Sequence, residues 1–179
     1  YRLKGYIGFA RPELYEMWNT SYSAVLKHLR RGAWYGETNM NQGHADVTVV
    51  DSLSAFWPGL QVLVGDIGMA ADTHAAFHSL WLRLGVLPER YDVRRESVVD
   101  RPWADVYPLR PELAESCYFL FRATGDRKYQ QMGAEMVRSL NAYARTPAGC
   151  ASRSSGRELR QGDRLSSFFL AESLKYVYL

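Results

Sequence analysis

The sequence predicts an all-α fold built from stacked helical hairpins. Gly8, Gly65 and Gly125 recur at intervals of about sixty residues, and each is followed by a run of residues that favour a helix. Two helices joined by such a short turn form an α-helical hairpin. Stacked hairpins bury each other's faces, either in an open solenoid or in a closed barrel. The long and uneven connections of this chain favour a closed toroid.

The N-terminal part predicts one long helix followed by a small β-hairpin. The helix is expected at about 11–30, with Pro12 near its start. Residues 34–39 and 44–50 alternate between apolar and polar side chains, and polar turn residues separate them. This pattern is typical of two antiparallel strands.

The next predicted helix, at about 51–64, contains Pro58-Gly59. Proline inside a helical run either kinks the helix or starts it anew. Further along, the chain is expected to form surface loops and a last helix; these segments are 92–106 (loop), 146–165 (loop) and 166–179 (helix).

The most informative segment is a predicted helix at 111–123. Pro111 fits the first helical position and Gly125 fits the residue after the helix end. Glu112 and Glu115 are three residues apart in the first turns and therefore share a face. The rest of the helix is apolar nearly all round, which is typical of a buried helix. The two carboxylates are therefore expected to point into a partly enclosed space.

This placement predicts that Glu112 is ionised. Backbone N–H groups at a helix start stabilise an anion and lower its pKa, and Arg110 acts in the same direction. An ionised carboxylate suits a general base or a ligand of a hard cation. The alternative is that both acidic residues only stabilise the helix start, which is a common role.

Composition and charge exclude some classes of protein. The 179 residues carry a formal net charge of +3, which argues against a nucleic-acid-binding protein. The chain has 12 Tyr and 5 Trp, which can stack on sugar rings but more often fill cores. No run of residues is long and apolar enough to span a membrane.

Several residues qualify as modification or metal sites. Cys117 is expected to be a free buried thiol, and Cys150 lies in a loop, where spacing alone leaves open a disulfide to a cysteine outside these 179 residues. His74 and His78 are four residues apart, but no acidic third ligand is evident, so a surface or core role is favoured over a metal site. Asn19 begins a glycosylation sequon.

Four segments together resemble glycoside hydrolase family 47, the class I α-1,2-mannosidases. They are YPLRPELAES at 107–116, SFFLAESLKYVYL at 167–179, VDSLSAFWPGLQVLVGD at 50–66 and LGVLPERY at 84–91. The last two are most similar to the ER degradation-enhancing α-mannosidase-like branch. The resemblance implies an (α/α)7 barrel of helical hairpins. Residues 1–179 would be an internal piece of that single catalytic domain, cut at both ends.

The resemblance also implies inverting hydrolysis of terminal α-1,2-linked mannose with the help of Ca²⁺. Glu112 matches the proposed catalytic base. The other matching positions are Arg110, Glu115, Phe168, Asp51 and Ser52 for the substrate, and Glu172 and Glu115, acting through water, for calcium. The processing mannosidases have histidine where Ser52 stands. The acid-bearing motif of the family is absent from this chain, so the chain by itself is expected to be inactive. It is also expected to be poorly stable, because apolar surface that faces the rest of the barrel would be uncovered.

The implied setting is the lumen of the endoplasmic reticulum, in a membrane-associated protein. The implied partners are high-mannose N-glycans on misfolded glycoproteins, with a protein disulfide isomerase-type oxidoreductase as a further candidate and no nucleic acid. The alternative function is a lectin-like factor that binds mannose and catalyses weakly or not at all. A helical scaffold without a sugar site is a third interpretation.

Overall fold

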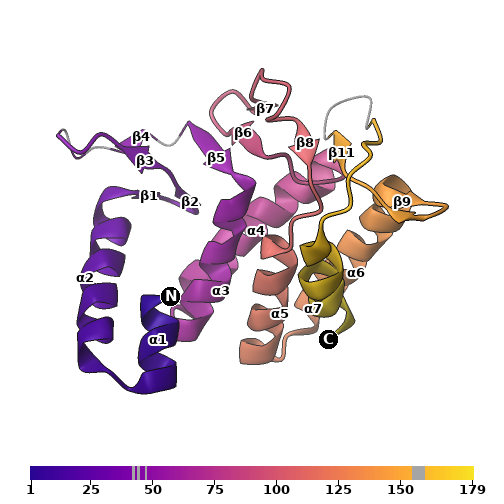
Figure 1. Ribbon diagram of the computed structural model, residues 1–179. Helices are drawn as coiled ribbons and strands as arrows, with labels where there is room; N and C mark the ends of the chain where they lie inside the picture. Colours follow the sequence, from indigo (N-terminus) through magenta and orange to yellow (C-terminus); the bar gives the residue numbers. More distant parts are fainter. Residues whose placement is uncertain (42, 44, 47, 155–159) are drawn as a thin grey trace. The chain divides into compact units, whose positions relative to one another are not determined.

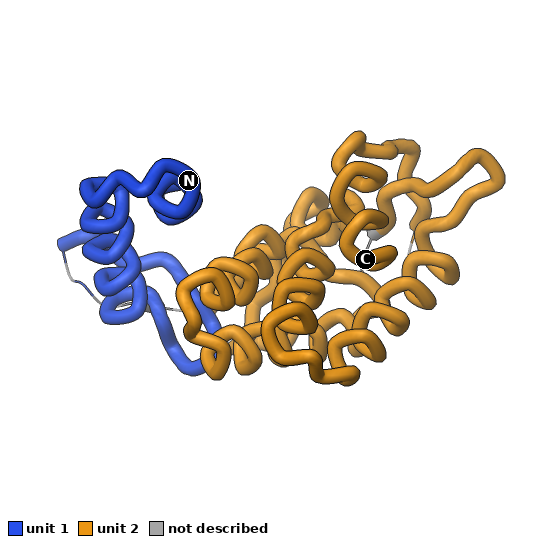
Figure 2. Tube along the Cα trace, turned by 90° about the horizontal axis from the view of Figure 1, so that it is seen from below, with its two compact units in different colours: residues 1–47 blue, residues 48–179 orange. Residues whose placement is uncertain are grey.

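The computed structural model describes residues 1–41, 43, 45, 46, 48–154 and 160–179. The chain divides into two compact units, Tyr1–Val47 and Thr48–Leu179 (Figure 2).

The first unit is a helical hairpin followed by short strands. Helices α1 (Arg2–Phe9) and α2 (Pro12–His28) pack against each other, and Pro12 lies in the first turn of α2. The turn between them falls at Ala10, which adopts a left-handed conformation with φ 51°. The prediction that the first helix ends at Gly8 is therefore wrong, because Gly8 lies inside α1.

The predicted β-hairpin forms in part. Strand β1 (Arg30–Arg31) pairs with β2 (Trp34–Tyr35), and β3 (Glu37–Thr38) pairs with β4 (Ala45–Asp46). The last residues of the predicted second strand do not continue this hairpin; they form β5 (Val49–Asp51) in the second unit. Residues 42, 44 and 47 of the predicted hairpin lie outside the described residues.

Strand β5 pairs instead with β6 (Arg90–Asp92), which also pairs with β7 (Ser97–Val98). These three strands form an antiparallel sheet in the order β5-β6-β7. The prediction of a plain surface loop at 92–106 is thus wrong at β7 and at β8 (Val106–Tyr107). Strand β8 pairs with a partner distant in sequence, β11 (Arg153–Ser154), and such a pairing leaves little local signal. Strand β7 has only two residues and pairs with the nearby β6.

Two further helical hairpins form the body of the second unit (Figure 1). Their helices pair consecutively and are α3 (Trp57–Val64), α4 (Ile67–Leu84), α5 (Glu112–Thr124) and α6 (Arg127–Ser139). Gly65 and Gly125 make the turns with φ 90° and 68°, which glycine adopts without steric cost. The predicted hairpin repeat is confirmed at both positions.

A buried hydrogen-bonded contact joins the α3 region to α5. The predicted helix at 51–64 is a 3-10 helix, η1 (Ser52–Phe56), followed by α3, which begins at Trp57 with Pro58 in its first turn. Ser116 Oγ of α5 donates to the carbonyl of Ala55 at 2.6 Å and accepts from the backbone N–H of Gly59 at 3.0 Å. A Cβ on Gly59 would lie 3.1 Å from Phe119, so the glycine permits this close approach.

The C-terminal part contains two π-helical segments, η2 (Leu140–Ala144) and η3 (Phe169–Leu174), the second continuing into α7 (Lys175–Tyr178). The predicted loop at 146–165 contains short strands. They are β9 (Arg145–Thr146), paired with β10 (Gly149–Cys150), and β11 (Arg153–Ser154), paired with β8. Residues 155–159 lie outside the described part. The predicted C-terminal helix is confirmed, although its first part is π-helical.

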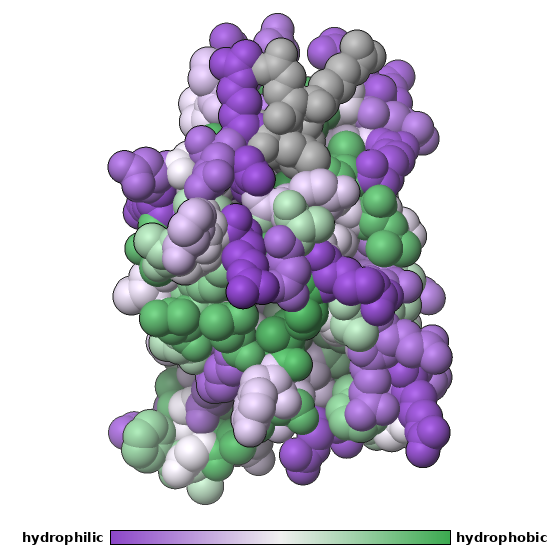
Figure 3. Space-filling model, turned by 90° about the vertical axis from the view of Figure 1, so that its right-hand side faces the viewer, coloured by the Kyte–Doolittle hydropathy of each residue, from purple (hydrophilic) through white to green (hydrophobic). Residues whose placement is uncertain are grey.

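The core of the second unit is made of apolar side chains from α4, α5, α6 and η3, such as Phe77, Trp81, Leu120, Met136 and Phe169. Some hydrophobic side chains remain exposed on the face seen in Figure 3. No described helix has the length and hydrophobicity that a membrane crossing requires.

Candidate active site

The site is built where the chain enters α5. Leu109, which is fully buried, adopts a positive φ of 67°, a conformation that a residue with a bulky side chain rarely takes. Its carbonyl accepts a hydrogen bond from Ser173 Oγ of η3 at 2.8 Å. Helix α5 then begins at Glu112, one residue later than predicted, with Pro111 as its N-cap. This bend brings the segment that carries Glu172 against the segment that carries Arg110 and Glu112.

Glu112 is the most perturbed carboxyl of the site. Its Oε2 is buried and makes no hydrogen bond to any described residue. Burial raises the pKa of Glu112 from 4.5 to about 7; its own backbone N–H and Arg110 lower it, whereas Glu115 and Glu172 raise it. The prediction that the pKa of Glu112 is lowered is therefore wrong in this structure. The helix start and Arg110 act in the predicted direction, but loss of hydration outweighs them.

Glu115 is held by a tyrosine of the C-terminal helix. Tyr176 Oη donates to Glu115 Oε1 at 2.9 Å. The Tyr176 ring also lies 5.7 Å from the ring of Tyr118 and 6.1 Å from that of Phe119, measured between centroids. Burial and the bond to Glu115 raise the pKa of Tyr176, so its hydroxyl stays protonated and donates. This hydrogen bond fixes Oε1 of Glu115 and leaves its Oε2 able to accept a hydrogen bond.

Arg110 is paired with a carboxylate that the sequence analysis did not select. Its Nη2 lies 2.6 Å from Glu89 Oε1, and its Nε lies 2.9 Å from Oε2 and 3.0 Å from Oε1. Ser52 Oγ donates to the same Oε2 at 2.8 Å. Bidentate pairs of this kind are the strongest hydrogen-bonded ion pairs in proteins. Because Glu89 balances its charge, Arg110 only partly offsets the burial of Glu112.

Asp51 caps η1 and forms a second ion pair. Its Oδ1 accepts from the backbone N–H of Leu53 at 2.8 Å, and its Oδ2 lies 3.2 Å from Nε of Arg90. Asp51 and Arg90 face each other at the end of the β5–β6 ladder. Together with Glu89 and Glu112, Asp51 raises the pKa of Arg110. Asp51 therefore belongs to the same electrostatic cluster.

The structure thus brings most of the predicted residues together. Glu112, Glu115 and Glu172 interact with one another or with shared neighbours, and Arg110 interacts with Asp51 and Glu112. Ser52 is linked to Arg110 through Glu89, because both side chains bond to its carboxylate. Ser52 itself is buried, with 3% of its surface exposed. Phe168 is the half-buried N-cap residue of η3, and its role beneath a sugar stays a prediction.

Three residues of the site were missed by the sequence analysis: Glu89, Tyr176 and Ser173. Glu89 lies in the segment LPERY and Tyr176 in LKYVYL, two segments that carried the family resemblance. No spacing pattern links Glu89 to Arg110 or Tyr176 to Glu115, since these contacts join positions 21 and 61 residues apart. The signal available was only their membership of those segments.

The histidine pair is part of the core. His74 and His78 are buried and their rings stack 6.0 Å apart, so their nitrogens do not converge. Burial, reinforced by His78, lowers the pKa of His74 to about 3. An acidic neighbour does exist, because Glu135 Oε2 lies 3.2 Å from Nε2 of His78. The favoured core role is consistent with these contacts.

The carboxylates suit a hydrated cation better than a bare one. Within the described ranges, no group of three or more His, Cys, Asp or Glu side chains is placed to coordinate a metal directly. Glu112 nevertheless has an unpartnered buried oxygen, and Glu115 and Glu172 lie near it. Carboxylate oxygens of this kind fit the water shell of Ca²⁺.

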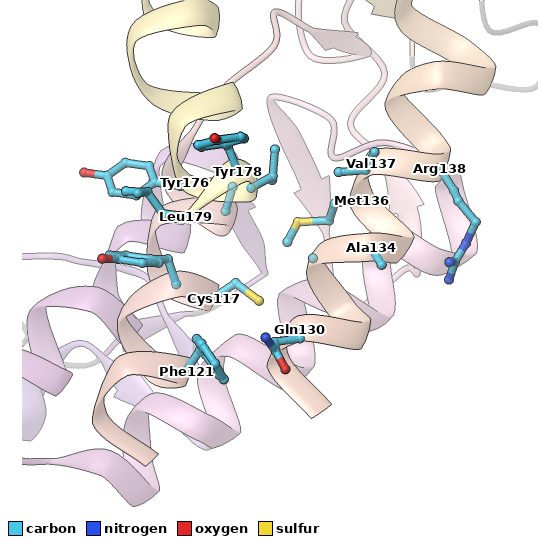
Figure 4. A pocket seen from close by; sticks show the side chains of 14 residues that line it. Cys117, Phe121, Gln130, Ala134, Met136, Val137, Arg138, Tyr176, Tyr178 and Leu179 are labelled. Atoms are coloured by element: carbon cyan, nitrogen blue, oxygen red, sulfur yellow. The ribbon is translucent and has the colours of Figure 1, made fainter. Parts of the chain in front are cut away.

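Both cysteines are free thiols in this structure. Cys117 is buried, as predicted, and its thiol contacts the carbonyl of Tyr129 at 3.1 Å. It lines a cleft of about 520 Å³ between α5, α6 and α7 (Figure 4). None of the predicted site residues lines this cleft, but Tyr176, which donates a hydrogen bond to Glu115, does, so the cleft adjoins the acidic cluster.

Comparison with known proteins assigns the family. The profile of glycosyl hydrolase family 47 matches residues 1–179, and the chain belongs to that family. It is 46% identical over 179 residues to "Alpha-mannosidase I MNS5" of Arabidopsis thaliana, covering 100% of this chain and 31% of that protein. It is 39% identical over 182 residues to "ER degradation-enhancing alpha-mannosidase-like protein 3" of Homo sapiens, covering 100% of this chain and 19% of that protein.

A solved structure confirms the fold class. The chain is similar to an alpha-1,2-mannosidase from Trichoderma reesei, with a TM-score of 0.79 and 21% identity, over 99% of this chain and 43% of that chain. The predicted (α/α)7 mannosidase fold is therefore confirmed for the part present here. The chain spans less than a third of the length of the two curated relatives.

Proposed function

We propose that the protein hydrolyses terminal α-1,2-linked mannose from high-mannose N-glycans, with inversion at the anomeric carbon. Family membership supports glycoside hydrolysis, and the names of the relatives point to mannose. Some relatives are named ER degradation-enhancing. These names support misfolded glycoproteins as the carriers of the glycan and the lumen of the endoplasmic reticulum as the compartment. An oxidoreductase of the protein disulfide isomerase type is a further proposed partner.

The observation that carries this proposal is the environment of Glu112. A carboxyl with a pKa of about 7 is a stronger base than an ordinary glutamate once it has lost its proton. Its buried, unpartnered Oε2 is free to accept a proton from water. Glu112 is therefore proposed as the general base that deprotonates the attacking water.

The other residues of the cluster would bind and orient the substrate. Arg110, which Glu89 holds in place, would donate to sugar hydroxyls, and Asp51 is proposed beside it. Phe168 would pack against the apolar face of the sugar ring. Ser52 was predicted to contact substrate, but its hydroxyl is already bonded to Glu89.

Glu115 and Glu172 are proposed to hold Ca²⁺ through its water shell. When bound, the cation would orient the sugar hydroxyls and the attacking water. Tyr176 occupies one oxygen of Glu115, so it orients that carboxylate. Inversion also needs a general acid placed across the sugar, about 6.5–9.5 Å from the base. We propose that it comes from a region of the family domain that aligns outside residues 1–179.

The test uses a protein that includes the whole family domain. It is incubated with a high-mannose N-glycan, and the products are followed by NMR. Inversion of an α-linkage predicts that β-mannose appears first and then mutarotates. Addition of a calcium chelator should stop release, and Ca²⁺ should restore it. First appearance of α-mannose would contradict inversion. Binding of the glycan without any release would favour the lectin-like alternative.

A further inference from the structure

Ser52 holds Glu89 at two points. It is the first residue of η1, and its backbone N–H donates to the carbonyl of Glu89 at 3.1 Å. Its hydroxyl donates to Oε2 of the Glu89 side chain at 2.8 Å. Ser52 is also almost fully buried, with 3% of its surface exposed. Both the main chain and the carboxylate of Glu89 are therefore fixed relative to η1.

Glu89 in turn holds one edge of Arg110. The guanidinium uses Nε and Nη2 for the carboxylate, at distances of 2.6–3.0 Å. Its Nη1 makes no hydrogen bond to a residue within the described part of the chain, and about a quarter of the side chain is exposed. Because the guanidinium group is planar and rigid, fixing Nε and Nη2 also fixes the direction in which Nη1 points. Arg110 stands two residues before Glu112 and acts on its charge.

We propose that Ser52 is a positioning residue of the active site and does not itself contact the sugar. It fixes Glu89, and Glu89 fixes Arg110 with Nη1 left to donate to a hydroxyl of the bound mannose. This inference rests on the proposed function of the same site. The physical reason is entropic: a long Arg side chain that is already ordered loses less freedom when the sugar binds.

The experiment compares Ser52→Ala with Ser54→Ala in the full-length protein. Ser54 lies in the same 3-10 helix but makes no side-chain hydrogen bond to a described residue, so it controls for loss of a serine in η1. Release of mannose from an α-1,2-linked mannobioside gives kcat and KM. Loss of a hydrogen bond to a charged group predicts a drop of about tenfold in kcat/KM for Ser52→Ala. Ser54→Ala should stay within about twofold of wild type.

A double-mutant cycle with Glu89→Ala separates positioning from direct contact. If Ser52 acts through Glu89, Ser52→Ala should cause no further loss once Glu89 is Ala. An undiminished tenfold loss in that background would mean that Ser52 meets the sugar directly and would overturn the inference. Wild-type kinetics for Ser52→Ala would overturn it as well.

Two measurements keep the test decisive. If Glu89→Ala does not fold, a crystal structure of Ser52→Ala decides: a displaced Glu89–Arg110 pair supports the inference, and an unmoved pair contradicts it. If the wild type releases no mannose, the proposed hydrolysis fails. The affinity of the same variants for the mannobioside, measured by calorimetry, then tests the positioning role separately, with Ser52→Ala expected to bind more weakly than Ser54→Ala.

Discussion

Replacement of Glu112 by Gln should make the protein more stable while it removes catalysis. Burial raises the pKa of this carboxyl from 4.5 to about 7, so the folded state holds its proton more tightly than the unfolded state. The favourable contribution of the protonated form is complete below pH 4.5 and is lost as the pH rises through about 7. Above that pH, the folded protein carries a charge that burial disfavours. Glutamine is never charged and avoids this cost.

The pKa shift of Glu112 determines how much Glu112→Gln should raise the free energy of unfolding. At about 1.4 kcal/mol per pKa unit, the full cost of charging Glu112 is about 3 kcal/mol. Because the side chain is only half-buried, solvent screening reduces this to about 2 kcal/mol. The Glu112→Gln variant should therefore exceed wild type by that amount at about pH 8, and the two should converge at about pH 4.

The assay is urea denaturation at several pH values with calcium chelated, because a bound cation would itself stabilise the charged carboxylate. Glu16→Gln, at an exposed position of α2, is the matched control and should change the free energy of unfolding by less than about 0.5 kcal/mol. Equal or lower stability of Glu112→Gln at about pH 8 would refute the reasoning that burial dominates at this site.

Three further predictions concern other parts of the chain. Ser116→Ala should lower the free energy of unfolding by about 2–4 kcal/mol, because it leaves the backbone N–H of Gly59 buried without a partner; Ser79→Ala, which removes an exposed hydroxyl, should cost less than about 0.5 kcal/mol in the same denaturation assay. The pKa of His74 is lowered to about 3, so the unfolded state binds a proton at higher pH than the folded state does. The free energy of unfolding should therefore fall as the pH drops from about 6.5 towards 3, and His74→Phe should make this fall less steep. An equally steep fall in His74→Phe would mean that other groups cause the pH dependence. Expression in a secretory host should add an N-glycan to the exposed Asn19, seen as a mass shift that Asn19→Gln abolishes; a wild-type mass without the shift would contradict this.

Local signals predicted the helical framework well. Gly65, Gly125 and Pro58 mark turns or helix starts through their own backbone preferences, so their effect can be read without tertiary information. Gly8 misled the prediction because the turn is made by Ala10, a residue that seldom takes a positive φ. The pairing of β5 with β6 was missed because it joins strands about forty residues apart in sequence.

Some members of the candidate site were predictable, but its electrostatics were not. Helix spacing placed Glu112 and Glu115 together, and family resemblance added Arg110 and Glu172. The pKa of Glu112 depends on how much water the fold removes, which no local pattern contains. The same holds for Glu89, whose role rests on contacts with side chains that only the fold brings together.

The most direct test of the central claim compares mannose release by wild type and Glu112→Gln from a high-mannose N-glycan, with glycan affinity measured in parallel. If Glu112 is the general base, turnover should fall about a hundred- to ten-thousand-fold, because glutamine cannot accept the proton of water. Glycan affinity should remain close to wild type, since the substitution acts on the transition state. Equal turnover by the two proteins would contradict the assignment of Glu112 as the base.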